Sequence, residues 1–362
     1  MDPIIVVGAG ISGVACARVL AEAGLPVTVV DRGRRIGGRM ASRHLAERPV
    51  DTGAQYFTVT DDRFARVVAD LEAIGVVRPW TDTFTVLSSG AAPATKQGPL
   101  RWGTPAGMRS VVEELASGLE VREGAVEVVT ADADGLRVDG TPASAVVLAM
   151  PDGQAVHLLG EGLSSLAADL TREWEPVLAL TAWWPTRLWD LDGAFVAGAF
   201  VNDDPDLAWI ADDGSRRGDG APVLVAHSTP AFAAPHVPDP HAALPAMVAA
   251  LQRVLGISSS PSGTHLQRWS MARPTGSRDE PFRLTPAGLG VCGDGWGPVS
   301  KVEGAFLSGA ALGDALVTRL EAEAQERRDA QIRADLARAR AADQGEEHAF
   351  VRQLGFEELL ED

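Results

Sequence analysis

The sequence predicts an α/β fold with a buried parallel sheet, because a strand, a helix and a strand follow one another at its start. Residues 3–7 and 25–30 are short apolar segments, of the kind that is buried on both faces of a sheet. Residues 11–23 are rich in Ala, Val and Leu and stop before Gly24, which is typical of a buried helix. The three segments form a βαβ unit, whose two strands run parallel.

Length and composition limit the class of protein. The chain has 362 residues, of which 46% are apolar and 22% charged, so a mostly disordered or fibrous protein is excluded. The length predicts one large domain or two interwoven ones. The formal net charge of −17 repels phosphate backbones and anionic lipids, so neither nucleic acid nor a membrane surface is an expected partner.

The start of the chain also bears on location. No basic segment precedes the first apolar residues, and glycines follow them at once. We therefore expect neither a signal peptide nor a membrane span, and a cytoplasmic location.

Further elements are expected along the chain. A helix is predicted at 108–115, and three short runs after it, at 120–122, 125–131 and 135–138, resemble a small β-meander. Apolar strands are predicted at 145–150 and 288–292.

The C-terminal part of the chain is expected to be helical. A helix is predicted from Val302 to Leu320. Beyond it the chain is rich in Ala, Glu and Arg, which predicts a solvated helix over 321–342. Spaced apolar residues predict a last helix over 348–360, which we expect to pack on its own body rather than to reach a partner.

A glycine motif lies between the first strand and the first helix. The string Gly8-Ala9-Gly10-Ile11-Ser12-Gly13 has the pattern G-x-G-x-x-G. The first glycine permits a tight turn, the second lets a pyrophosphate approach the backbone, and the third allows close packing of helix on strand. Asp31 follows the second strand, where a carboxylate accepts hydrogen bonds from ribose hydroxyls and repels a 2′-phosphate. The motif therefore predicts binding of an adenine dinucleotide.

Two later segments favour a flavin dinucleotide. Gly37-Gly38-Arg39 follows Asp31; a glycine pair lets the chain lie against a cofactor, and an arginine pairs with a phosphate. Near the end of the chain, Gly293-Asp294 follows an apolar strand, and a carboxylate there can accept hydrogen bonds from a ribityl chain. The next helix begins near Val302, and the positive end of its dipole would favour the electron-rich edge of a reduced flavin.

Together these motifs resemble the amine-oxidase-like branch of the FAD-dependent oxidoreductases, over about residues 3–320. Within that branch the chain is most similar to the renalase-like group. Three strings carry this likeness: Asp51-Thr52-Gly53-Ala54-Gln55-Tyr56-Phe57, Ala226-His227-Ser228-Thr229-Pro230, and Arg268-Trp269 shortly before Ala272-Arg273-Pro274.

The resemblance implies a Rossmann-like FAD-binding domain assembled from separated segments, with an interleaved α+β substrate domain. The expected divisions are 1–56, 101–152 and 284–320 for the FAD-binding domain, 57–100 and 153–283 for the substrate domain, and 321–362 for a C-terminal helical extension. The implied FAD contacts are Gly8, Gly10, Ile11, Ser12, Gly13, Asp31, Arg32, Gly38, Arg39, Met40, Gly53, Ala54, Gln55, Val126, Gly293, Asp294 and Val302.

The two cysteines, Cys16 and Cys292, bear on how the flavin is held. Monoamine-oxidase relatives attach flavin through a cysteine just ahead of the last FAD segment, and Ser270-Met271-Ala272 stands there in this chain. The FAD is therefore expected to be non-covalent. The cysteines are too far apart in sequence for a disulfide framework, and no Cys/His cluster has metal-ligand spacing, so no metal is expected.

The chain has one dinucleotide motif and no second one, so no separate domain is expected to deliver NAD(P)H electrons to the flavin. The resemblance implies that a dihydronicotinamide dinucleotide, NAD(P)H or one of its isomers, meets the flavin directly, with O2 as acceptor and H2O2 as product. Two alternatives stay open: a biosynthetic amine or alicyclic oxidase or desaturase, and a flavin- or nucleotide-binding protein without turnover. The oligomeric state does not follow from the sequence. The residues expected at the reacting centre are His227, Trp209, Gln55 and Tyr56.

Overall fold

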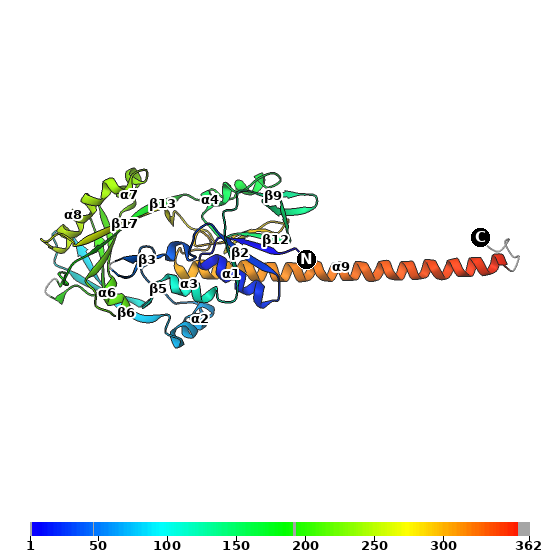
Figure 1. Cartoon of the computed structure of the whole chain (residues 1–362), viewed down its shortest axis with the longest axis horizontal. Helices are drawn as coiled ribbons and strands as arrows, with labels where there is room; N and C mark the ends of the chain where they lie inside the picture. The colour runs from blue at the N-terminus through cyan, green and yellow to red at the C-terminus, as the bar shows by residue number, and fades with distance from the viewer. Residues whose placement is uncertain (1, 46, 191–192, 354–362) are drawn as a thin grey trace. The chain divides into compact units, whose positions relative to one another are not determined.

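The computed structural model describes residues 2–45, 47–190 and 193–353. The chain divides into two units, Met1–Asp314 and Ala315–Asp362. The first unit contains a six-stranded sheet and an eight-stranded sheet (Figure 1). The mixed α/β fold class predicted from the sequence is confirmed.

The six-stranded sheet gathers strands from the beginning, the middle and the end of the first unit. β1 pairs in parallel with β2 on one side and with β12 on the other. β19 continues the parallel sheet beyond β12, and β18 adds an antiparallel edge. The order is β18 (Arg283–Leu284), β19 (Leu289–Val291), β12 (Ala145–Leu148), β1 (Ile4–Val7), β2 (Val27–Asp31), β8 (Glu120–Glu123). The predicted assembly from separated segments is thus present in the sheet itself.

One strand of the predicted β-meander lies elsewhere. The run at 120–122 is β8, which pairs in parallel with β2, where Thr28 lies opposite Glu120. The meander consists instead of β9 (Val129–Asp132), β10 (Gly135–Val138) and β11 (Thr141–Ala143). The prediction was wrong here because adjacency in sequence favours a hairpin, whereas this run pairs in parallel with the edge of β2.

Helix α1 (Ile11–Glu22) is buried along most of its length and contacts the first turns of α9, which begins at Val302. Two glycines allow this contact. A Cβ at Gly309 would lie 1.9 Å from the carbonyl oxygen of Ser12, and a Cβ at Gly313 would lie 2.8 Å from Val19. The helices therefore approach each other through backbone rather than through side chains.

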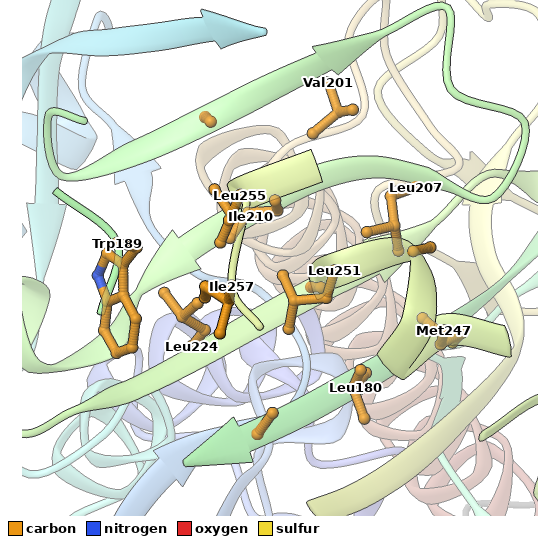
Figure 2. Close-up of a cluster of buried hydrophobic side chains, with 14 of the residues drawn as sticks. Leu180, Trp189, Val201, Leu207, Ile210, Leu224, Met247, Leu251, Leu255 and Ile257 are labelled. Atoms are coloured by element: carbon orange, nitrogen blue, oxygen red, sulfur yellow. The ribbon is translucent and has the colours of Figure 1, made fainter. Parts of the chain in front are cut away.

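The eight-stranded sheet is largely antiparallel and forms the second core. Its order is β17 (Gly263–Pro274), β13 (Trp174–Trp183), β16 (Val223–Ser228), β15 (Leu207–Asp212), β14 (Gly198–Asn202), β6 (Arg78–Ser88), β7 (Ala94–Gly103), β5 (Phe57–Thr58). Helices α7 (Pro230–His236) and α8 (Leu244–Leu255) cover one face. Figure 2 shows Leu180 and Leu224 of the strands beside Met247 and Leu251 of α8. The opposite face, here called the inner face, carries the residues of the candidate site.

The remaining elements are short. They are η1 (Gly38–Met40), the hairpin β3 (Ser42–Leu45) and β4 (Arg48–Asp51), α2 (Asp62–Ala73), α3 (Arg109–Leu115), α4 (Asp152–Val156), α5 (Ser164–Ala167), α6 (Asp213–Arg217) and η3 (Pro240–Ala243).

Residues Met1–Asp314 form one compact unit, and β7 runs across residue 100, where a domain boundary is expected. The inner domain boundaries therefore stay predictions.

Helix α9 (Val302–Gln353) is longer than predicted, because the expected helices at 302–320 and 321–342 are continuous. Residues 321–338 are largely exposed, which confirms the solvated helix that far. The prediction that the segment 348–360 packs on its own body concerns side chains and residues that the structure does not describe. Within the described ranges, no helix combines the length and the apolar character that crossing a bilayer requires.

Candidate functional site

The turn after β1 has the geometry of a dinucleotide cradle. Gly8 has φ +109°, and a Cβ there would lie 2.7 Å from the carbonyl oxygen of Ala149. A Cβ at Gly13 would lie 1.9 Å from the oxygen of Gly8. Gly10 differs, since its φ of −77° suits any residue and an added Cβ would meet no atom of the described residues within 4 Å. The fold itself thus needs glycine at positions 8 and 13, whereas at position 10 the glycine leaves open space.

The start of α1 suits an anion. Its first turn has no acidic residue, and no described side chain caps it. Ile11 is buried, and the buried hydroxyl of Ser12 has no nitrogen or oxygen partner among the described residues. Helix N-termini with free N–H groups bind phosphates, because the helix dipole favours negative charge there. The residues at this turn therefore fit the pyrophosphate of a dinucleotide.

Asp31 ties the turn to the loop that follows β2. One carboxylate oxygen accepts the backbone N–H of Ala9 at 2.7 Å, and the other accepts that of Gly33 at 2.7 Å. Each oxygen keeps a further lone pair that a ribose hydroxyl can use. Arg32 beside it is exposed, and Val126 lies half-buried in the loop before β9, against the core cluster that contains Val7. Contact of these residues with FAD stays a prediction.

Replacing Asp31 by asparagine should weaken flavin retention by ~1.5–3 kcal/mol, because one of two charge-assisted acceptors becomes an amide NH2 group. Flavin occupancy after dialysis measures this effect. Asp139→Asn is the matched control, since Asp139 also accepts two backbone N–H groups, at 3.0 and 2.9 Å, but lies in the β-meander. Equal flavin occupancy in Asp31→Asn and wild type would remove Asp31 from the cofactor site.

The second glycine pair lies directly against the first turn. The N–H of Gly37 donates to the oxygen of Ala9 at 2.8 Å, and a Cβ at Gly38 would lie 3.5 Å from the Cα of Gly10. Met40 of the same segment is buried. Arg109, which sequence reasoning missed, holds this segment from both ends by donating to the carbonyl oxygens of Ile36 and Ser42. The two glycine segments therefore form one continuous surface.

Arg39 and Asp294, far apart in sequence, form an ion pair. Two guanidinium nitrogens of Arg39 lie 2.9 and 2.5 Å from the carboxylate oxygens of Asp294. The guanidinium also lies over the ring of Trp174, 4.8 Å from its centroid. Gly293, just before Asp294, has φ +145°, and an added Cβ would meet no described atom within 4 Å. The structure thus joins two predicted contacts to each other, while their pairing with phosphate and ribityl groups stays a prediction.

The segment from Asp51 to Gln55, here called the flavin-side loop, folds against Arg39. The N–H of Ala54 donates to the oxygen of Arg39 at 2.9 Å, and a Cβ at Gly53 would lie 1.9 Å from that same oxygen. The side-chain amide of Gln55 closes the loop by donating to the oxygens of Asp51 at 2.8 Å and Gly53 at 3.0 Å. The Oε1 atom of Gln55 is buried and has no partner among the described residues.

A buried ion cluster fixes the flavin-side loop, and sequence reasoning missed it. Asp51 accepts from Arg216 at 2.5 Å and from Arg217 at 2.9 Å, and both arginines also pair with Asp213. Arg216 in addition donates to the carbonyl oxygen of Gln55 at 2.7 Å. Burial alone would raise the pKa of Asp213, but Arg216, Arg217 and Arg48 outweigh it and lower that pKa. The cluster keeps the carboxylate of Asp213 ionised.

The predicted catalytic residues lie together on the inner face. Tyr56 follows the flavin-side loop, and its ring centroid is 5.7 Å from that of Trp209 and 5.3 Å from that of Phe84. Trp209 on β15 lies opposite His227 on β16 in the strand register. Burial raises the pKa of Tyr56. The structure thus brings Gln55, Tyr56, Trp209 and His227 into one neighbourhood; their catalytic roles are not tested by it.

His227 is held neutral. Burial, and then the positive charges of Arg273 and Arg216, lower the pKa of its imidazole to about 4. The unfolded chain binds this proton near pH 6.5, so stability present above that pH is lost as the pH falls toward 4. We expect a loss of up to about 3 kcal/mol across that window, and His227→Gln should flatten it. Urea unfolding of both proteins between pH 4 and 7 measures this effect, and parallel profiles would contradict it.

The start of α9 is anchored by an unexpected carboxylate. Glu303, directly after Val302, accepts the backbone N–H groups of Thr60 at 2.6 Å and Asp61 at 2.8 Å. Lys301 pairs with it at 2.5 Å. Burial opposes ionisation, but Lys301 and the hydrogen bonds from Thr60 and Asp61 lower the pKa of Glu303 to about 2. The helix end predicted to face the flavin is therefore fixed to the segment after β5.

Two family models match the chain. Residues 6–71 match a model described as an NAD(P)-binding Rossmann-like domain. Residues 93–312 match a model described as flavin containing amine oxidoreductase. Together they confirm the predicted Rossmann-like fold and FAD as the cofactor.

Curated relatives match over short segments only. The chain is 46% identical over 59 residues to a probable polyamine oxidase 4 of Arabidopsis thaliana, covering 16% of this chain and 12% of that protein. It is 43% identical over 72 residues to a hydroxyneurosporene desaturase of Rubrivivax gelatinosus, covering 19% and 14%. It is 39% identical over 69 residues to the flavin-containing amine oxidase B of Homo sapiens, covering 19% and 13%. The matched segments thus span about an eighth of each relative's length.

Solved structures show the same fold over most of the chain. A cyclohexylamine oxidase from Brevibacterium oxydans IH-35A is similar with a TM-score of 0.71 at 15% identity, covering 88% of this chain and 99% of that one. A wild-type putrescine oxidase bound to putrescine is similar with a TM-score of 0.67 at 14% identity and the same coverage. At these identities the likeness shows the fold.

Proposed function

Because the chain belongs to the flavin containing amine oxidoreductases, whose model matches residues 93–312, we propose that it is an FAD-dependent oxidase of the renalase-like kind. Its proposed electron donor is a dihydronicotinamide dinucleotide, NAD(P)H or one of its isomers, and its proposed acceptor is O2, with H2O2 as product. Bound flavin supplies the two-electron acceptor for such a hydride donor.

The observation that favours a hydride donor is that the groups around the flavin-side loop are unsuited to removing a proton from an ammonium. The nearby carboxylate of Asp51 is paired with two arginines, and that of Asp213 with three. The imidazole of His227 has a pKa of about 4 and is therefore a weak base. Hydride transfer requires mainly that the donor carbon is well placed.

The chain's own residues supply binding and orientation. The glycine segments at 8–13 and 37–38, with the start of α1, form the surface for the dinucleotide. The flavin-side loop is held from the sheet side by Trp269, whose indole N–H donates to the oxygen of Thr52 at 2.6 Å. Tyr56, which is half-buried and backed by the buried ring of Trp209, forms an aromatic wall on the inner face against which a planar donor ring is proposed to stack.

Anaerobic mixing of the purified holoenzyme with a panel of dihydronicotinamides and amines tests the proposal. Dihydronicotinamides should bleach the flavin absorption, and admission of air should restore it with one H2O2 formed per donor oxidised. Bleaching by amines alone would point to the alternative, an amine or alicyclic oxidase, which the fold shared with cyclohexylamine oxidase supports. A flavin that no member of the panel reduces would favour a binding protein without turnover.

The flavin is proposed to be non-covalent, as neither thiol is suited to attachment. Cys16 and Cys292 are both buried, and burial raises the pKa of Cys292 to about 12. A thiol that stays protonated is a poor nucleophile. Acid precipitation of the holoenzyme should therefore release all flavin into the supernatant, and yellow colour retained in the pellet would contradict this.

A further inference from the structure

The inner face of the eight-stranded sheet carries a row of three polar side chains. They are His265 on β17, Thr181 on β13 and His227 on β16. Thr181 lies directly opposite His265, and His227 lies opposite Ala179, two residues from Thr181. Side chains two residues apart on a strand share a face, so Thr181 lies between the two imidazoles, at roughly 5 Å from one and 7–8 Å from the other.

Each member of the row has a buried polar atom that is unpaired. The hydroxyl of Thr181 and the Nε2 atoms of His227 and His265 have no hydrogen-bond partner among the described residues. Thr181 is fully buried, whereas both imidazoles are partly exposed. Unpaired buried polar groups are costly, so three of them side by side need an explanation. A ligand that reaches the row past the imidazoles provides it.

The row leads away from the flavin-side loop. Trp269, which donates to Thr52, lies on the same face of β17 as Gln267 and His265. Four residues of strand separate Trp269 from His265, which is about 13 Å. His227 lies beside Trp209, next to the aromatic wall. His227 is thus the end of the row nearest the wall, and a group bound between Thr181 and His265 is remote from a ring that stacks beside the loop.

The charges around the row are positive, although the whole chain carries −17. Burial first, then Arg43 and His241, lower the pKa of His265, while Arg273 and Arg216 act on His227. Arg216 is balanced by the buried ion cluster, and Arg273 lies 3.6 Å from Glu175. Arg43 donates to the side-chain oxygen of Gln267 at 2.9 Å and forms no ion pair within the described ranges. Among the described residues named in this paragraph, no carboxylate is left unpaired to act as the counter-ion of an ammonium ion.

We propose that the row of His265, Thr181 and His227, together with Arg43, binds an oxyanion of the substrate, a phosphate or a carboxylate remote from the carbon that gives up the hydride. A hydroxyl, two imidazole N–H groups and a guanidinium can all donate to such an oxyanion. The inference rests on the proposed function because it takes the inner face as the side on which the substrate binds. It specifies in addition the charge of the substrate and the residues that recognise this charge.

Matched aromatic probes test the sign of the charge. The holoenzyme is titrated with 3-phenylpropanoate, 3-phenylpropan-1-ol and 3-phenylpropan-1-amine, and binding is followed by the change in flavin absorption. The carboxylate should bind at least about tenfold more tightly than the alcohol, and the amine least tightly. A parallel titration with 2-phenylethyl phosphate shows whether phosphate or carboxylate is preferred. Tightest binding by the amine, or no binding by either anion, would overturn the proposal.

The variant Thr181→Val tests whether the row causes the preference for the carboxylate probe over the alcohol. It should lower the carboxylate-over-alcohol ratio about tenfold and leave the melting temperature equal or higher, since the lost hydroxyl is unpaired. Thr85→Val is the matched control, because buried Thr85 lies on the other face, donates to Ala194 at 2.9 Å and accepts from Val196 at 2.8 Å. It should lower the melting temperature without changing the ratio. A wild-type ratio in Thr181→Val overturns the proposal.

The two proposals fail in different ways. If dihydronicotinamides leave the flavin oxidised while the anionic probes bind through Thr181, the proposed donor is wrong and the oxyanion site stands. If dihydronicotinamides reduce the flavin equally well in Thr181→Val and wild type, and the probe ratio does not change, the donor stands and the oxyanion site is wrong.

Discussion

Replacing Arg216 by methionine is expected to lower the free energy of unfolding by about 3–5 kcal/mol. Arg216 is fully buried and pairs with Asp51 at 2.5 Å and with Asp213. Its removal leaves Asp51 with Arg217 alone, which is shared with Asp213, and a buried charge that loses its partner costs more than the ion pair contributed. Urea unfolding of wild type and variant at neutral pH measures the difference.

Arg253→Met is the matched control for this effect. Arg253 also pairs with two aspartates, Asp204 at 2.8 Å and Asp206 at 3.2 Å, but its side chain is 54% exposed. Exposed ion pairs contribute about 0–1 kcal/mol because solvent screens them, so this variant should unfold almost like wild type. Equal losses in the two variants would show that burial of the cluster does not matter.

The same cluster should affect the flavin. Arg216 donates to the carbonyl oxygen of Gln55, so it fixes both ends of the flavin-side loop. Arg216→Lys keeps the charge but replaces a planar fork of donors with a single ammonium, which cannot hold all three acceptors in the same geometry. We expect this variant to fold and to show a shifted flavin absorption spectrum. An unchanged spectrum would limit the role of Arg216 to stability.

Replacing Gly10 by alanine is expected to weaken FAD binding about 10–100-fold, by analogy with the ~1–3 kcal/mol that an extra methyl costs in a filled space. The φ of −77° at Gly10 is accessible to alanine, and the added Cβ meets no described protein atom within 4 Å. The apoprotein should therefore keep its melting temperature. Flavin content after purification, and a titration of the apoprotein with FAD, measure the loss.

Gly13→Ala provides the contrast. Its Cβ would lie 1.9 Å from the carbonyl oxygen of Gly8, so the turn between β1 and α1 must shift. This variant should lose stability in the apoprotein as well as flavin. If Gly10→Ala binds FAD like wild type, the pyrophosphate does not lie against Gly10, and the position assigned to it is wrong.

The cofactor and the turn proposed to hold it could be predicted from the sequence because the signals are local. A G-x-G-x-x-G string between an apolar strand and an apolar helix specifies a turn in which steric contacts within a few residues, such as that between Gly13 and Gly8, leave few alternatives. The family match and the parallel sheet confirm the FAD and Rossmann-like predictions. The misplaced strand at 120–122 shows the limit, since its partner β2 lies about ninety residues away and no local pattern names it.

The sequence by itself thus determined the α/β class, the cofactor and the glycine segments proposed to hold it, through backbone geometry that only neighbouring residues decide. Only the tertiary structure decided which charges and polar groups meet. Arg216 reaches Asp51 across 165 positions, and Thr181 reaches His265 through the register of two strands. In the sequence these residues are ordinary polar positions, because a buried ion pair or a row of unpaired hydrogen-bonding groups depends on which strand faces lie together. The proposed oxyanion site therefore depends on sheet register, and the proposed dinucleotide cradle on local turns.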